Sequence, residues 1–220
     1  MREYFKKYKG SLIITSLLNL LPIGAGLILW EDLPEKMPMH WGINGEVDNW
    51  GSKAVAVFVM PLILFAAQWL CFFASGLDPK RRNLNPKVLS IVLGIIPGIN
   101  LAIHAGLYLY ALGYEVDMVP IVCALMGVLF ILIGNYLPKC KQSYTMGIKL
   151  PWTLHDEENW NATHRLGGKL WVCGGVLTIV CGFLPPVAAF IVLMVVVAVM
   201  VAVPTIYSYR LYKKKNQDAE

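Results

Sequence analysis

Charged side chains are scarce in this sequence: they make up 15% of the 220 residues, whereas hydrophobic residues make up 57%. Soluble domains carry about 25% charged residues, so a chain built around an ordinary water-soluble core is excluded. A helix that crosses the hydrocarbon layer needs roughly 20 mostly apolar residues. The sequence contains six apolar runs near that length, at 11–30, 54–77, 88–112, 118–137, 167–184 and 187–209. It therefore predicts an all-α, polytopic membrane protein whose six transmembrane helices form one domain, residues 1–220.

Signatures of catalysis and of cofactor binding are also missing. The sequence has no HExxH, G-x-S-x-G, Walker or Gly-rich nucleotide motif. Its five cysteines are odd in number and contain no C-x-x-C pair, which argues against a disulfide framework or a cysteine metal site. His155 and His164 are nine positions apart, hence about half a turn out of phase on one helix, and cannot share a metal ion there. We expect no enzymatic activity, no metal site and no cofactor.

Basic residues are nearly absent from alternate connections between the apolar runs. Seventeen of the nineteen lie at the two termini or near the connections after the second and fourth runs. The other connections hold only Lys36 and Lys53, together with seven acidic residues. Because lysine and arginine mark the cytoplasmic side of membrane proteins, this pattern predicts cytoplasmic termini and an acidic outer surface. The positive net charge thus reports topology and does not indicate nucleic-acid binding.

The outer loop at residues 31–53 is rich in proline, glycine and tryptophan and has no helical or strand periodicity. We expect a compact, turn-built lid, in which glycines permit turns that hold His40 and Trp41 in a defined pose. Two interpretations stay open for His40 and Asp48, which either tie the loop together or contact a ligand. The candidate binding residues of this loop are His40, Trp41, Gly45, Asp48 and Trp50.

The inner loop at residues 138–166 contains a helix-start signal. Thr153 is followed three residues later by Asp156, a spacing that resembles a capping box, and Pro151 cannot continue a helix from upstream. We therefore predict a short helix at about 154–165 that lies along the inner membrane surface, separate from the fifth transmembrane helix. This loop either fixes the bend of the chain into the membrane or docks a partner.

Polar residues within the apolar runs are costly in lipid and often mark function. Asn100 and His104 are four residues apart, on one face of the third helix, with Gln68 and Asn19 as possible partners. They either form interhelical hydrogen bonds or line a path for a ligand or proton. The sequence GIIPG at 94–98 has two glycines separated by three residues, which predicts a close helix–helix approach there.

Both long loops resemble those of a known family. The outer stretch LPEKMPMHWGINGEVDNWGSK and the inner stretch MGIKLPWTLHDEENWNATHRLGG are similar, in order and spacing, to the signatures of SdpI-type immunity proteins. Lys149 and Leu150 stand where the family usually has arginine and threonine, and Ser143 where asparagine is common. On the inner loop the resemblance singles out Gly147, Pro151, Trp152, Thr153, Glu157, Trp160, Thr163, His164 and Arg165.

The resemblance implies a protein of the bacterial plasma membrane that protects its cell from a secreted peptide toxin of the SDP type. We expect the toxin to bind at the outer loop. One alternative is a signalling receptor that holds a cytoplasmic winged-helix repressor at the membrane. Another is a membrane transporter or enzyme that uses His104 and Asn100. The expected partners are the toxin, the lipid bilayer and, for the receptor, the repressor, with no nucleic acid; the oligomeric state is left open.

Overall fold

The computed structural model describes residues 2–84 and 86–217, so residues 1, 85 and 218–220 of the expected domain lie outside the described part. Short π-helical and 3-10 turns occupy Val55–Val59, Arg81–Asn83 and Leu137–Lys139. The main elements are α1 (Arg2–Ile28), β1 (Lys36–Trp41), β2 (Val47–Ser52), α2 (Met60–Leu77), α3 (Pro86–Ala111), α4 (Met118–Tyr136), α5 (Pro151–His155), α6 (Glu157–Cys181) and α7 (Pro186–Gln217).

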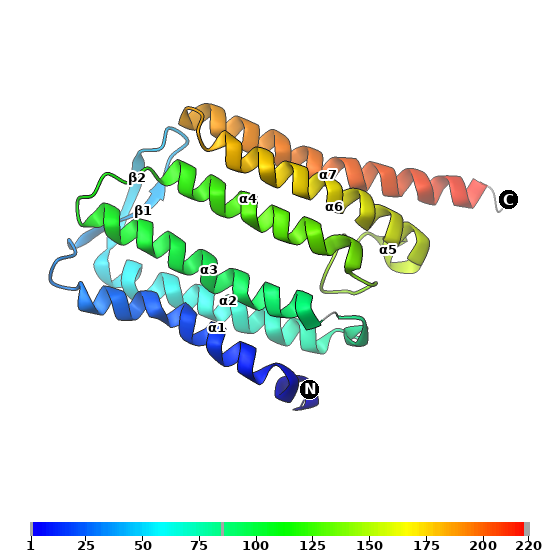
Figure 1. The fold of residues 1–220 in the computed structure, drawn as a ribbon, viewed down its shortest axis with the longest axis horizontal. Coiled ribbons are helices and arrows are strands. Elements are labelled where there is room, and N and C mark those ends of the chain that lie inside the picture. Colours follow the sequence, from blue (N-terminus) through cyan, green and yellow to red (C-terminus); the bar gives the residue numbers. More distant parts are fainter. Residues whose placement is uncertain (1, 85, 218–220) are drawn as a thin grey trace.

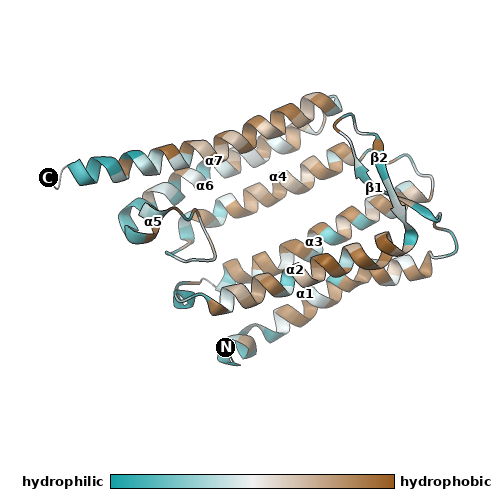
Figure 2. Ribbon diagram, turned by 180° about the vertical axis from the view of Figure 1, so that it is seen from behind, coloured by the Kyte–Doolittle hydropathy of each residue, from teal (hydrophilic) through white to brown (hydrophobic). Residues whose placement is uncertain are grey.

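The long helices coincide with the six apolar runs, which confirms an all-α membrane protein. Five of them are long and apolar enough to cross a bilayer: α1, the helix spanning Val55–Leu77, α3, the helix spanning Met118–Lys139, and α7. The sixth, α6, is more polar because Arg165 and Lys169 lie in its first half. Figure 2 shows apolar residues along most of the helices, with polar residues on the strands at one end of the molecule and near the chain ends and α5 at the other. A sixth crossing by α6 stays a prediction.

The helices form two units. The first helical unit consists of α1, α2 and α3, and the second of α4, α6 and α7, with α3 and α4 adjoining (Figure 1). One end of the molecule carries β1 and β2 and is called the hairpin end. The other carries both described ends of the chain and the connecting segments 78–84 and 137–150, and is called the basic end.

Glycines determine how closely α4 and α6 pack. A Cβ atom at Gly134 would lie 2.8 Å from the Gly168 carbonyl oxygen, and one at Gly127 would lie 2.5 Å from the Gly175 carbonyl oxygen. Each helix thus presents two glycines seven residues apart to the other backbone, and a methyl group at any of them would force the helices apart. The prediction of a close helix–helix approach at 94–98 is wrong, since no described atom of another element lies within 4 Å of a Cβ built at Gly94 or Gly98.

The outer loop is a β-hairpin, so the expectation of a lid built from turns alone was wrong. Strands β1 and β2 pair antiparallel, and the register is irregular around His40. The turn is closed by hydrogen bonds from the Gly42 N–H to the Glu46 carbonyl (2.8 Å) and from the Gly45 N–H to the Gly42 carbonyl (2.9 Å). Gly45 adopts φ +82°, which glycine accommodates without strain. The irregular register hides the two-residue period in the sequence.

The predicted surface helix at 154–165 is also wrong, because Thr153 and Asp156 act in two different helices. Thr153 Oγ1 accepts from the Leu150 N–H (2.9 Å) at the start of α5. Asp156 caps α6, where its Oδ1 accepts from the N–H groups of Glu158 (2.9 Å) and Asn159 (3.2 Å). As a result α6 begins at Glu157 and continues without interruption into the apolar run that follows.

Candidate functional site

The hairpin reaches from the first helical unit to the second. The chain enters it from α1 and leaves it toward α2, while a Cβ built at Gly45 would contact Pro186 of α7 (3.2 Å) and Val119 of α4 (3.4 Å). The Trp41 ring meets the Tyr110 ring of α3 edge-on, with centroids 5.7 Å apart. The hairpin therefore bridges the outer ends of α3, α4 and α7.

A cavity of about 370 Å³ lies beneath this bridge. Residues 39–43 of the hairpin line it, together with Ile103 of α3 and a larger set from α4 and α7 that includes Val122 and Phe190. Three methionines, Met39, Met60 and Met118, are among the lining residues, and their flexible side chains adapt to irregular apolar ligands. Both helical units thus contribute to one apolar site at the hairpin end.

The predicted outer residues have different positions in this arrangement. His40 and Trp41 line the cavity. Asp48 holds His40 through a contact of 2.6 Å between Oδ1 and the ring Nδ1, which are both exposed. Gly45 forms the tip, and Trp50, which is 51% exposed, is not among the lining residues. A tie between His40 and Asp48 is therefore present, and the same tie positions the imidazole at the rim of the cavity.

Lys53 has a structural role that the sequence reading missed. Its side chain is buried, and its Nζ donates to the carbonyl oxygens of Trp30 and Leu33, both at 2.9 Å. Glu35 pairs with the same ammonium group at 3.1 Å. The available signal was that only two lysines occur in this acidic loop, Lys36 and Lys53. The buried Lys53 side chain fixes the segment between α1 and β1 and so sets where the hairpin begins.

At the basic end, the side chains of the inner motif pack mainly against one another and against the loop before α5. His164 Nε2 accepts from the Ile148 N–H (2.9 Å), and its Nδ1 lies 2.7 Å from the Trp160 carbonyl oxygen. The imidazole stacks on the Trp160 ring with centroids 4.0 Å apart, and the indole N–H of Trp160 donates to the Cys140 carbonyl. Burial lowers the pKa of His164 to about 4, so the ring is neutral near pH 7 and can accept this hydrogen bond.

The remaining inner residues attach α5 and α6 to α7. The indole N–H of Trp152 donates to Ser208 Oγ (2.7 Å), and Ser208 Oγ donates to Asn159 Oδ1 (2.7 Å). Thr163 Oγ1 also donates to Asn159 Oδ1 (3.0 Å). Asn159 and Ser208 were missed because they meet between α6 and α7, 49 residues apart in the chain, and such a pairing leaves no local spacing in the sequence. Of the predicted inner residues, the exposed ones are Gly147, Pro151, Glu157 and Arg165.

Asp78 is a further residue that the sequence reading missed. It is 2% exposed, and its Oδ2 accepts hydrogen bonds from Ser143 Oγ (2.6 Å), from the N–H groups of Tyr144 and Thr145 (both 3.0 Å) and from Thr145 Oγ1 (2.8 Å). Burial raises its pKa, but these donors outweigh burial and leave the pKa below its usual value. Its carboxylate joins the α2–α3 connection to the loop before α5. Ser143, a departure from the family pattern, serves this join.

The predicted intramembrane residues form a hydrogen-bonded chain between α1, α2 and α3. Asn19 Nδ2 donates to Gln68 Oε1 (2.6 Å), and Asn100 Nδ2 donates to Asn19 Oδ1 (2.8 Å). His104 Nδ1 lies 2.9 Å from the Asn100 carbonyl oxygen. Among the described residues, Asn100 Oδ1 and His104 Nε2 have no hydrogen-bond partner. The predicted partners Asn19 and Gln68 are thus in place.

Comparisons with known proteins match both loops. Residues 139–208 match the model of the SdpI/YfhL protein family, and residues 17–65 match a domain of unknown function, DUF1648. The chain is 29% identical to the immunity protein SdpI of Bacillus subtilis (strain 168) over 212 residues, which cover 93% of this chain and 97% of that protein. No solved structure matches. The resemblance seen in the sequence is thereby confirmed, and with the apolar helices it shows a multi-pass bacterial membrane protein.

Proposed function

We propose that this relative of the SdpI/YfhL family is an immunity protein that captures a secreted, membrane-active peptide in the cavity beneath the hairpin. The observation that carries the proposal is the position of that cavity, which is built by both helical units and roofed by residues 39–43 of the hairpin. A peptide that disrupts bilayers carries apolar surface. An apolar cavity at the depth where such a peptide first enters the lipid can hold that surface by burial.

Charge at the hairpin end favours a cationic peptide. Under the predicted topology, the segments outside the membrane there hold seven acidic residues and two lysines. Both lysines lie in the loop 31–53, and the Lys53 ammonium is already paired with Glu35. The net negative charge would raise the local concentration of a cationic toxin, although salt limits this attraction to about 8 Å at physiological ionic strength.

The test is a killing assay. A bacterium sensitive to an SDP-type peptide expresses the protein or one of two variants, with membrane levels matched by immunoblot. Val122→Trp fills the cavity, whereas Ile191→Trp places the same bulk on an exposed, lipid-facing position of α7 that does not line it. We expect protection by the wild type and by Ile191→Trp, and loss of protection with Val122→Trp.

The outcomes separate function from site. If the wild type gives no protection, the immunity proposal is wrong. If Val122→Trp protects as well as Ile191→Trp, immunity stands but the cavity is not where the peptide binds.

A second candidate is favoured by a groove at the basic end. Between the first turns of α6 and the last turns of α7 lies a groove of about 430 Å³ whose lining includes Asp156, Arg165 and Lys215. Its charged, exposed lining suits a soluble protein such as a winged-helix repressor. Arg165→Glu should then abolish co-purification of such a regulator while leaving the thermal unfolding midpoint unchanged, and retained co-purification would exclude this docking site. Trp160 cannot serve as a contact because it is fully buried.

A further inference from the structure

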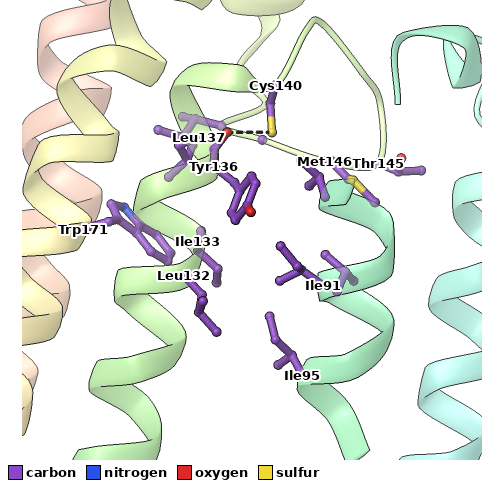
Figure 3. A pocket seen from close by; sticks show the side chains of 14 residues that line it. Ile91, Ile95, Leu132, Ile133, Tyr136, Leu137, Cys140, Thr145, Met146 and Trp171 are labelled. Carbon is purple, nitrogen blue, oxygen red and sulfur yellow. Dashed lines mark hydrogen bonds between the residues drawn. The ribbon is translucent and has the colours of Figure 1, made fainter. Parts of the chain in front are cut away.

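A second apolar cavity lies at the basic end, on the line where the two helical units adjoin. Its volume is about 290 Å³, and it is lined by Ile91 and Ile95 of α3, by Leu132 and Ile133 of α4 and by residues 145–148 of the loop before α5 (Figure 3). Since α3 and α4 both qualify as membrane spans, the cavity faces the acyl region of the leaflet at the basic end. A hydrocarbon chain is the natural occupant of such a space.

One polar atom in this wall has no partner. The Trp171 side chain reaches the cavity from α6, beside Leu132 and Ile133 (Figure 3). Its Nε1 is buried and has no acceptor among the described residues. Since this nitrogen has almost no accessible surface, the indole contributes its apolar ring to the wall and its N–H does not face the cavity.

Lysines stand at the mouth of the cavity. Lys139 Nζ lies 4.8 Å from the ring centroid of Tyr136, and Lys149 Nζ donates to the Thr145 carbonyl at 3.3 Å; Tyr136 and Thr145 both line the cavity. The segments 86–99 and 132–149, which supply nearly all of the lining, contain four lysines and no acidic residue. One carboxylate, Asp78, bonds to the lining residue Thr145 from the α2–α3 connection, so four lysines face one acidic residue and the charge around this mouth still complements an anion.

We propose that this cavity binds an anionic phospholipid of the leaflet at the basic end. One acyl chain would lie between α3 and α4, against the ring of Trp171, and the phosphate would face Lys139 and Lys149. Basic pockets between membrane helices recognise anionic headgroups through the same combination of charge and apolar depth. The bound lipid would fill the join between the two helical units at the end opposite the hairpin.

The experiment is native mass spectrometry of the purified full chain equilibrated with equal amounts of dioleoyl-phosphatidylglycerol and dioleoyl-phosphatidylcholine. We expect the wild type to retain the anionic lipid preferentially. The double variant Lys139→Gln/Lys149→Gln should lower the preference roughly thirtyfold, since each lysine near an anionic surface is worth about 1 kcal/mol. Lys213→Gln/Lys214→Gln removes the same charge from the end of α7, away from this cavity, and should keep the preference.

A filling variant tests the apolar part. Ile133→Trp should reduce retention of both lipids, whereas Ile191→Trp, which lies outside the cavity, should not. Circular dichroism checks that each variant is folded. If Ile133→Trp does not fold, the two double lysine variants are sufficient to test the proposal. Equal retention of the two lipids by the wild type, or an equal loss of preference in both double lysine variants, would overturn it.

Discussion

At the scale of single residues, the inner motif is best understood as a set of side chains that fill and cap one another. Trp160, Thr163, His164 and Thr153 are fully buried, and each of their polar groups has a defined partner. Residues of this kind specify a fold because replacing one leaves the other polar group unsatisfied in a dry interior. The motif therefore contributes to function chiefly through the shape of the basic end.

Gly147 provides a sharp test of this packing. It has φ +110°, and a Cβ there would lie 2.5 Å from His164 Nε2 and 2.8 Å from the Trp160 ring. Gly147→Ala should lower stability by about 3 kcal/mol, because backbone strain adds to overpacking. The measurement is thermal unfolding in detergent. Gly113→Ala is the control: Gly113 has φ +89° with no described atom within 4 Å of its Cβ, so about 1 kcal/mol is expected from strain alone. Equal losses would contradict the packing argument.

The neutral state of His164 makes a pH dependence testable. Its pKa is lowered from 6.5 to about 4 in the folded protein, so the unfolded chain takes up a proton between these values and the folded protein does not. This contribution to stability is present above pH 6.5 and is lost as the pH falls toward 4. His164→Gln should reduce the unfolding midpoint at pH 7 and flatten its fall between pH 6.5 and 4. Parallel pH profiles of variant and wild type would refute the assignment.

At the scale of elements, short connections hold the helices in place at each end. The hairpin reaches α4 and α7 at one end, and the Asp78 carboxylate joins the α2–α3 connection to the loop before α5 at the other. Lys80 and Asn83 reinforce the second join through hydrogen bonds to Gln142 (3.1 and 2.8 Å). Both loops that carry the family signatures therefore connect the two helical units.

Replacing Asp78 should separate this join. Four donors point at one oxygen of the Asp78 carboxylate. Asp78→Asn removes the negative charge, and in one orientation of the amide its N–H₂ group would face these donors. We expect a loss of about 2–3 kcal/mol in stability and faster protease cleavage in the loop 140–147. Asp117→Asn is the control, because Asp117 is an exposed helix cap and asparagine caps equally well. Unchanged cleavage in Asp78→Asn would count against the join.

At the scale of the whole molecule, two three-helix units meet along α3 and α4, with an apolar cavity at the hairpin end and another at the basic end. The cavity at the hairpin end is roofed by a β-hairpin and the one at the basic end by the loop before α5. This arrangement places the proposed peptide site and the proposed lipid site on opposite faces of one join.

The predicted topology can be tested on intact cells. In a background without native cysteines, a cysteine at Asn44 in the hairpin turn should react with a membrane-impermeant maleimide before lysis. A cysteine at Lys141, in the loop before α5, should react only after lysis, because positively charged loops stay in the cytoplasm. Labelling of position 141 in intact cells would reverse both surfaces and every role assigned to them.

Patterns that depend on neighbouring residues in the chain were predictable. Apolar runs of membrane-spanning length and the charge bias of the connections gave the helices and their expected orientation, because lipid penalises every exposed polar group. The Asn100–His104 spacing and the partners Gln68 and Asn19 also followed from helical periodicity.

The tertiary structure decided what those patterns leave open. It determined that Asp156 starts a helix continuous with the fifth apolar run, that the glycines which bring helices together lie on α4 and α6, and that Asp78, Lys53 and Ser208 join distant segments. Partners that are 20 to 70 residues apart leave no periodic trace in the sequence, because their pairing depends on which helix faces meet. The amino-acid sequence alone thus determined which segments form long apolar helices, whereas packing determined where the chain forms cavities.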